Sequence, residues 1–117
     1  MRPPIIYVSH PFGGDAANVT RAREICKSYA RQLPEALFVP ALSVTCRPCD
    51  PDHYGRDLQL LLELESRCDV VFMTGDWECS LGCQTEYDFA TRQGIPIAET
   101  YADLLAILTS VEKGELD

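Results

Sequence analysis

The 117-residue sequence lacks a long apolar run and lacks an excess of positive charge. A membrane-spanning helix needs about 20 consecutive apolar residues, and no stretch of this chain approaches that length. The N-terminal segment has no apolar core followed by a small-residue cleavage site, so we expect a cytoplasmic protein. Lysine and arginine total 10 against 18 aspartates and glutamates, for a net charge of −8. Because this charge repels a phosphate backbone, we expect neither long nucleic acid nor a membrane as a partner.

Cysteine, in contrast, is not scarce, because the chain has six. Without a secretory signal, we expect most of them to be reduced thiols that pack as small apolar side chains. Cys46 and Cys49 have the Cys-x-x-Cys spacing of a zinc or redox site. A structural zinc ion needs four ligands, and no second pair has a suitable spacing. A thiol-based redox or zinc protein is therefore kept only as an alternative, and we expect no metal and no organic cofactor.

Apolar runs alternate with helical patterns along the whole chain. Runs rich in β-branched and aromatic residues predict four strands, at residues 4–9, 36–40, 68–74 and 95–100. Apolar residues at helical spacing predict four helices, at residues 15–33, 55–67, 80–94 and 101–114. This order predicts an α/β fold with a parallel sheet of four to five strands and helices on both faces. No linker or repeat divides the chain, so we expect a single domain over residues 1–117.

Three polar segments should meet at the edge where the strands end. They are "SHPFGGD" (9–15), the loop at 41–55 and "GDWECSLG" (75–82). Open parallel sheets bind ligands beyond the carboxyl ends of their strands. Ser80 is the predicted N-cap of the third helix, and the N–H groups at such a helix start attract a phosphate or a carboxylate. Glu86 should lie one turn deeper, over Gly82, whose missing side chain leaves space above the carboxylate.

This arrangement suits a phosphorylated sugar, because a carboxylate below the anion site can attack an anomeric carbon. The alternative is that Ser80 only caps the helix, Gly82 only permits close packing and Glu86 is solvated. Trp77 is suited either to stacking on a base or to covering the end of the sheet. His10 is expected either to bind the ligand or to hydrogen-bond within its own turn.

Three motifs in order, "IYVSHPFGG", "GRDLQLLLELESRCDVV" and "SLGCQTE" with an alanine four residues later, resemble the nucleoside 2-deoxyribosyltransferase superfamily. The resemblance covers roughly residues 4–97 and is greatest to small bacterial and phage members, then to the 2′-deoxynucleoside 5′-phosphate N-hydrolases. It implies a flavodoxin-like (Rossmann-like) domain that cleaves the N-glycosidic bond of a nucleotide or nucleoside without a cofactor. It also implies a homodimer or higher homo-oligomer, because neighbouring subunits often complete the site in that superfamily.

The resemblance also implies roles for individual residues. Glu86 matches the nucleophile, Asp57 the residue that orients or protonates the leaving base, and Tyr7 the residue that holds the glutamate. Ser80 matches the position that touches the 5′ end of the sugar. Serine does not repel a phosphate as aspartate does, so it favours a nucleoside 5′-monophosphate. The expected phosphate cradle is completed by Ser9, His10 and the backbone of Gly13 and Gly14.

Two positions differ from the pattern of the superfamily. Gln84 stands where a second glycine often precedes the glutamate, and the "PFGG" turn has no arginine, which the hydrolase branch tends to carry there. These differences favour a second hypothesis, a non-catalytic nucleotide-binding or sensor module. That hypothesis predicts nucleotide binding without turnover.

Overall fold

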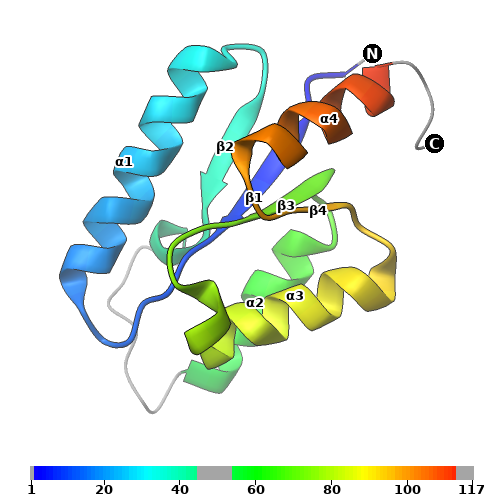
Figure 1. Cartoon of the computed structure of the whole chain (residues 1–117). Coiled ribbons are helices and arrows are strands. Elements are labelled where there is room, and N and C mark those ends of the chain that lie inside the picture. Colours follow the sequence, from blue (N-terminus) through cyan, green and yellow to red (C-terminus); the bar gives the residue numbers. More distant parts are fainter. Residues whose placement is uncertain (1, 45–53, 113–117) are drawn as a thin grey trace.

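Strands and helices alternate in the computed structural model, which describes residues 2–44 and 54–112 (Figure 1). The strands are β1 (Ile5–Ser9), β2 (Leu37–Pro40), β3 (Val70–Met73) and β4 (Ile97–Ala98). The α-helices are α1 (Ala16–Gln32), α2 (Tyr54–Glu65), α3 (Leu81–Gln93) and α4 (Tyr101–Glu112). Two short 3-10 helices, η1 (Ala41–Ser43) and η2 (Trp77–Cys79), follow β2 and β3. The predicted α/β fold is confirmed.

The sheet is entirely parallel, with the strand order β2-β1-β3-β4. In β1, Tyr7 is in register with Val39 of β2 on one side and with Val71 of β3 on the other. The first strand, β1, is central. The chain adds β2 on one side of β1, then adds β3 on the other side of β1 and β4 beyond β3. The strand order therefore reverses between β1 and β3. In open parallel sheets, ligands bind at the carboxyl ends of the two strands that flank such a reversal.

Helices cover both faces of this sheet, with α1 and α4 on one face and α2 and α3 on the other (Figure 1). Ile6 and Val8 of β1 pack on the first face, together with Cys26 of α1 and Leu104 of α4. Tyr7 packs on the second face. This alternation is the period of two that any strand has. Because both faces are buried, the strand sequences are continuous apolar runs.

Polar residues and glycine set the ends of two helices. The side chain of Asp15 caps α1 by accepting a hydrogen bond from the backbone N–H of Ala17. Ser80 caps α3 by accepting from the N–H of Cys83 at 3.3 Å. Gly94 ends α3 in the left-handed region with φ 72°, a conformation that favours glycine. The predicted N-cap role of Ser80 is confirmed, and Asp15 and Gly94 are end residues of the helices predicted at 15–33 and 80–94.

The fourth strand is shorter than the predicted 95–100, because only Ile97 and Ala98 pair with β3. Pro96 precedes them and has no N–H to donate to a ladder, although its carbonyl accepts from the N–H of Val71 at 2.9 Å. The strand is therefore a short edge to the sheet.

Part of the predicted loop at 41–55, with Cys46 and Cys49, lies outside the described residues. The four cysteines that are described are free thiols, of which three are buried and Cys79 is exposed. No helix within residues 2–44 and 54–112 is long and apolar enough to cross a membrane.

Leu104 anchors α4, and its side chain is completely buried. We expect Leu104→Ala to lower the free energy of unfolding by about 2–5 kcal/mol, because it removes buried apolar surface and leaves a cavity. Leu105→Ala is the matched control on the same helix. Leu105 is 40% exposed, so its truncation should cost at most about 1 kcal/mol. Chemical denaturation measures both variants, and equal losses would contradict this packing of α4.

Candidate active site

A cluster of polar side chains lies inside the domain, between β1 and the helices α2 and α3. Tyr7 and Ser9 are two residues apart in β1, so their side chains project from the same face of the strand, and both are fully buried. Glu86 is 5% exposed and lies on the buried side of α3 with Cys83 and Ala90, which are three residues before it and four after it. The predicted site residues Tyr7, Ser9 and Glu86 are thus brought together.

Two hydroxyl groups hold the carboxyl group of Glu86. The Tyr7 hydroxyl donates to Oε2, and Ser9 Oγ donates to Oε1 at 2.8 Å. The partners are 79 and 77 residues apart in the sequence, so only the folded sheet brings them together. Each carboxylate oxygen accepts one of these hydrogen bonds and has a second lone pair. These two hydrogen bonds fix the orientation of the carboxylate. They leave a lone pair on each oxygen that can accept another hydrogen bond or act as a nucleophile.

The surroundings of Glu86 also set its protonation behaviour. Burial raises the pKa of Glu86 above its ordinary value, whereas the hydrogen bonds from Tyr7 and Ser9 lower it. The pKa of Tyr7 is raised well above its ordinary value, first by burial and then by the charge of Glu86. Tyr7 therefore keeps its proton near neutral pH and acts as a hydrogen-bond donor to the carboxylate.

A second carboxyl group, that of Glu65, belongs to the same cluster. Glu65 is the last residue of α2 and is fully buried, and neither of its carboxyl oxygens has a hydrogen-bond partner within residues 2–44 and 54–112. Burial, followed by the charge of Glu86, raises the pKa of Glu65 to about 9. Glu65 is therefore protonated and neutral near pH 7. Glu65 was not among the site residues predicted from the sequence.

Asp57 shares one side of α2 with Glu65. It lies in the first turn of the helix, is 3% exposed, and precedes Leu61 and Glu65 by four and eight residues. Eight helical residues span about 12 Å, and α2 runs back from the carboxyl edge of the sheet. Asp57 is therefore near the edge where ligands of such folds bind, and Glu65 is deeper in the domain.

The segment after β3 carries three of the predicted substrate-binding residues. Trp77 lies in η2 and stacks on Tyr87 of α3, with ring centroids 5.0 Å apart and ring planes inclined by 9°. One face of the indole is therefore covered by the protein. Ser80 is the N-cap of α3 and Gly82 is its second residue. Both stand at the start of the helix that carries Glu86.

His10 contacts its own turn and the neighbouring loop. Its Nδ1 lies 2.8 Å from the carbonyl oxygen of Pro11, and since a carbonyl only accepts, Nδ1 carries the proton in this contact. On the other side of the ring, a Cβ added to Gly75 would lie 3.1 Å from Nε2, so the imidazole packs directly on that glycine. His10 is 7% exposed and joins the loops that follow β1 and β3.

The two glycines of the "PFGG" turn are needed for its shape. Gly13 and Gly14 have φ values of 57° and 76°, in the left-handed region that other residues rarely adopt. The backbone N–H of Asp15 donates to the carbonyl of Phe12 at 3.0 Å and closes the turn around them. Both glycines are exposed, so their backbone is open to a ligand.

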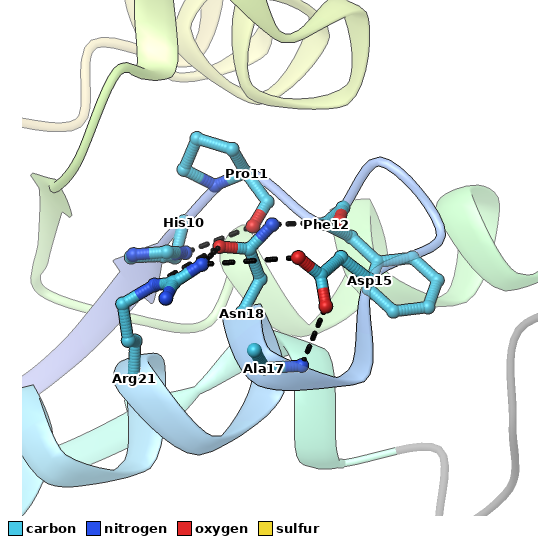
Figure 2. A network of polar contacts seen from close by, with 7 residues as sticks. All are labelled: His10, Pro11, Phe12, Asp15, Ala17, Asn18 and Arg21. Carbon is cyan, nitrogen blue, oxygen red and sulfur yellow. Dashed lines mark hydrogen bonds and ion pairs between the residues drawn. The ribbon is translucent and has the colours of Figure 1, made fainter.

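Arg21 reaches from α1 to this turn, as Figure 2 shows. Its Nε and Nη2 donate to Asn18 Oδ1 at 3.2 and 2.7 Å, and Nη2 lies 4.0 Å from Asp15 Oδ2. Asn18 in turn donates to the carbonyl of Phe12 at 2.8 Å. The "PFGG" turn itself has no arginine. Arg21 was predictable from its spacing, because a residue six positions after the Asp15 cap is on the second turn of α1.

Glu65 also had a signal in the sequence. It is four residues after Leu61 and in phase with the apolar side of α2, where an acid is expected only if the side chain is neutral or paired. Ser9 was predicted for the phosphate cradle, and its buried hydroxyl instead donates to Glu86.

The fold and this cluster define the class as a Rossmann-like parallel α/β protein with a buried polar cluster beside the central strand. The chain belongs to the family described as "Domain of unknown function (DUF7768)", whose profile matches residues 4–100. The matched range includes all four strands and the whole cluster. No curated protein matches the chain.

We expect Glu65→Gln to change how stability depends on pH. The pKa of Glu65 is about 9 in the folded protein, compared with about 4.3 for a glutamate in an unfolded chain. Between these values the folded protein holds a proton that the unfolded chain has released, so the contribution of Glu65 to stability is most favourable below pH 4.3 and becomes less favourable as the pH rises. Between pH 4 and pH 7 this loss is on the order of 3 kcal/mol.

Glutamine does not titrate, so the variant should lack this loss and gain stability over the wild type as the pH rises from 4 to 7. Chemical denaturation of both proteins at several pH values measures the effect. The same dependence on pH in the two proteins would show that Glu65 is already ionised in the fold.

Proposed function

We propose that this protein is a small enzyme that cleaves the N-glycosidic bond of a nucleoside 5′-monophosphate or nucleoside. The observation that carries the proposal is the Glu86 carboxyl group, buried beside the central strand and held through both oxygens by Tyr7 and Ser9. The resemblance to the nucleoside 2-deoxyribosyltransferase superfamily supports the same role. Within the cluster, Tyr7 and Ser9 have no exposed surface and Glu86 has 5%, so Glu86 is the member that a substrate can contact.

The proposed reaction is a double displacement. One oxygen of Glu86 attacks C1′ of the sugar, and the C1′–N bond breaks as its electron pair passes to the base. Asp57 orients the base, and a proton from Asp57 or from water neutralises the departing nitrogen. Water or a second base then attacks C1′ of the glycosyl ester and loses a proton to Asp57 or to solvent, while the ester bond breaks and the Glu86 carboxylate is restored. Neither step needs a metal or an organic cofactor, because side chains supply the nucleophile and the proton transfer.

Tyr7 and Ser9 hold the nucleophile in a fixed orientation, which lowers the entropic cost of reaching the transition state. Their hydrogen bonds also favour the ionised form of Glu86, the form that attacks. The two hydroxyl groups therefore oppose part of the rise that burial causes in the pKa of Glu86.

A 5′-phosphate has suitable partners at the carboxyl edge of the sheet. The Ser80 hydroxyl and the first N–H groups of α3 are hydrogen-bond donors, and the exposed backbone of Gly13 and Gly14 is a second source of them. Arg21 adds a positive charge beside the turn. Trp77 has one ring face covered by Tyr87, so a base would stack on the other face. By the same resemblance, we propose a homo-oligomer in which a neighbouring subunit completes the site.

The decisive experiment is a chromatographic assay for free base. Purified protein is incubated with a panel of ribo- and deoxynucleoside 5′-monophosphates and the matching nucleosides. Glu86→Gln should lower the rate of base release at least about a thousandfold, because it removes the nucleophile and keeps the shape of the side chain. Asp88→Asn is the matched control, since Asp88 is an exposed acid on the same helix, and it should keep the wild-type rate.

The outcomes of this assay separate the two hypotheses. Release of base by the wild type and by Asp88→Asn, but not by Glu86→Gln, would establish an N-glycosidase and identify its substrate. If no base is released while a nucleotide still raises the melting temperature, the protein is a nucleotide-binding module and the catalytic roles are wrong.

Ser80→Asp tests the preference for a phosphate. Aspartate caps a helix as well as serine does, so the fold should be kept. Its charge would repel a 5′-phosphate and accept a hydrogen bond from a free 5′-hydroxyl. We expect the ratio of kcat/KM for monophosphate to that for nucleoside to fall at least about tenfold. An unchanged ratio, with the melting temperature also unchanged, would place the 5′ end of the substrate elsewhere.

A further inference from the structure

The mechanism proposed above leaves one buried group without a role, and that group is Glu65. Glu65 on α2 and Glu86 on α3 are both buried, α2 and α3 pack against each other, and the charge of Glu86 acts on Glu65. The hydrogen-bond donors are divided unequally between them. Glu86 accepts from Tyr7 and Ser9, whereas neither oxygen of Glu65 has a partner.

This unequal division decides where a negative charge can lie. A buried carboxylate is stable only where donors replace the water that it has lost, and Glu86 has two such donors. Glu65 has none among the described residues and is also the last residue of α2, where the negative end of the helix dipole disfavours an anion. Two like charges in one buried cluster repel each other, so ionisation of one carboxyl group opposes ionisation of the other.

Among the described residues, the groups that interact electrostatically with Glu65 do not supply a compensating positive charge. Ionisation of Glu65 would raise the pKa of Tyr7, on β1, and of Cys68, after α2, and both of these groups are neutral donors at most. Asp69, next to Cys68, is itself an acid. Its carboxylate already accepts hydrogen bonds from Arg2 Nη2 at 2.6 Å and from the backbone N–H of Ile5 at 2.8 Å.

We propose that Glu65 is a positioning residue for Glu86: it keeps a proton, so that the cluster carries one negative charge and that charge lies on Glu86. The part of this inference that concerns catalysis rests on the proposed function, in which Glu86 is the nucleophile. If the proton were on Glu86 instead, the carboxyl group nearest to the substrate would be unable to attack. Glu65 thus acts only through the charge of Glu86 and contacts neither the sugar nor the base.

The location of the proton is measurable without any assay of activity. Protein labelled with ¹³C at the side-chain carboxyl carbon of glutamate is titrated by NMR as wild type, Glu65→Gln and Glu86→Gln. In the wild type, one glutamate should be protonated at pH 7 and should titrate near pH 9. This signal should be absent in Glu65→Gln. It should persist in Glu86→Gln and titrate about one pH unit lower or more, because the neighbouring charge is gone.

The opposite pattern would overturn the inference. A protonated signal that survives in Glu65→Gln and disappears in Glu86→Gln would place the proton on Glu86. A wild type with every glutamate ionised at pH 7 would show that the cluster carries two charges, and the inference would fail as well.

The pH profile of base release tests the positioning role. Glutamine matches protonated glutamate in size and charge, so Glu65→Gln should keep kcat within about threefold of the wild type at pH 7. Above pH 9 the wild type should lose activity, because a second buried charge repels both Glu86 and the substrate phosphate, and the variant should not. If Glu65→Gln is inactive at pH 7, or if it also loses activity above pH 9, the positioning role of Glu65 would be overturned. If the wild type releases no base, the proposed function fails, while the titration still decides which carboxyl group holds the proton.

Discussion

The carboxyl group of Glu86 is the constraint on which the other features of the site depend. An ionised carboxylate that is removed from water is costly unless donors replace the lost hydration. The central strand supplies both donors, because Tyr7 and Ser9 project from one face of β1 toward α3. That strand is paired on both sides, by β2 and β3, so its position relative to the helices is fixed. The parallel sheet thus holds two hydroxyl groups at a carboxylate that is almost 80 residues away in the sequence.

Most of the fold follows from local patterns in the sequence. The apolar runs and the helical periodicities predicted every strand and every α-helix, and Asp15, Ser80 and Gly94 marked helix ends correctly. The length of β4 was not predictable in this way. The run at 95–100 is apolar enough for a longer strand, but Pro96 lacks an N–H, and pairing depends on how far β3 extends beside it. Strand length is a property of the pair and not of one segment.

The candidate site was less accessible from the sequence than the fold. The residues after β1 and β3 could be selected because parallel strands end at a common edge, and a family resemblance pointed to Tyr7 and Glu86. The helical phase of Glu65 marks it as facing the apolar side of α2, but the phase alone does not show what surrounds the carboxyl group. Its burial depends on α3 and β1, which lie far from it in the sequence. For the same reason, the hydroxyl of Ser9 was expected at the ligand and lies at Glu86.

The strand β1 contributes to the hydrophobic core and to the polar cluster through alternate residues. Ile6 and Val8 pack with α1 and α4, while Tyr7 and Ser9 hold Glu86. A single inserted or deleted residue inside β1 would exchange the two sets, because neighbouring residues of a strand face opposite ways. In evolution, this segment can therefore change by substitution but not in length. Insertions are tolerated only where the strand has ended, such as in the exposed turn that begins at Phe12. Selection is thus free to remodel the loop after β1 while the carboxylate and its donors stay in register.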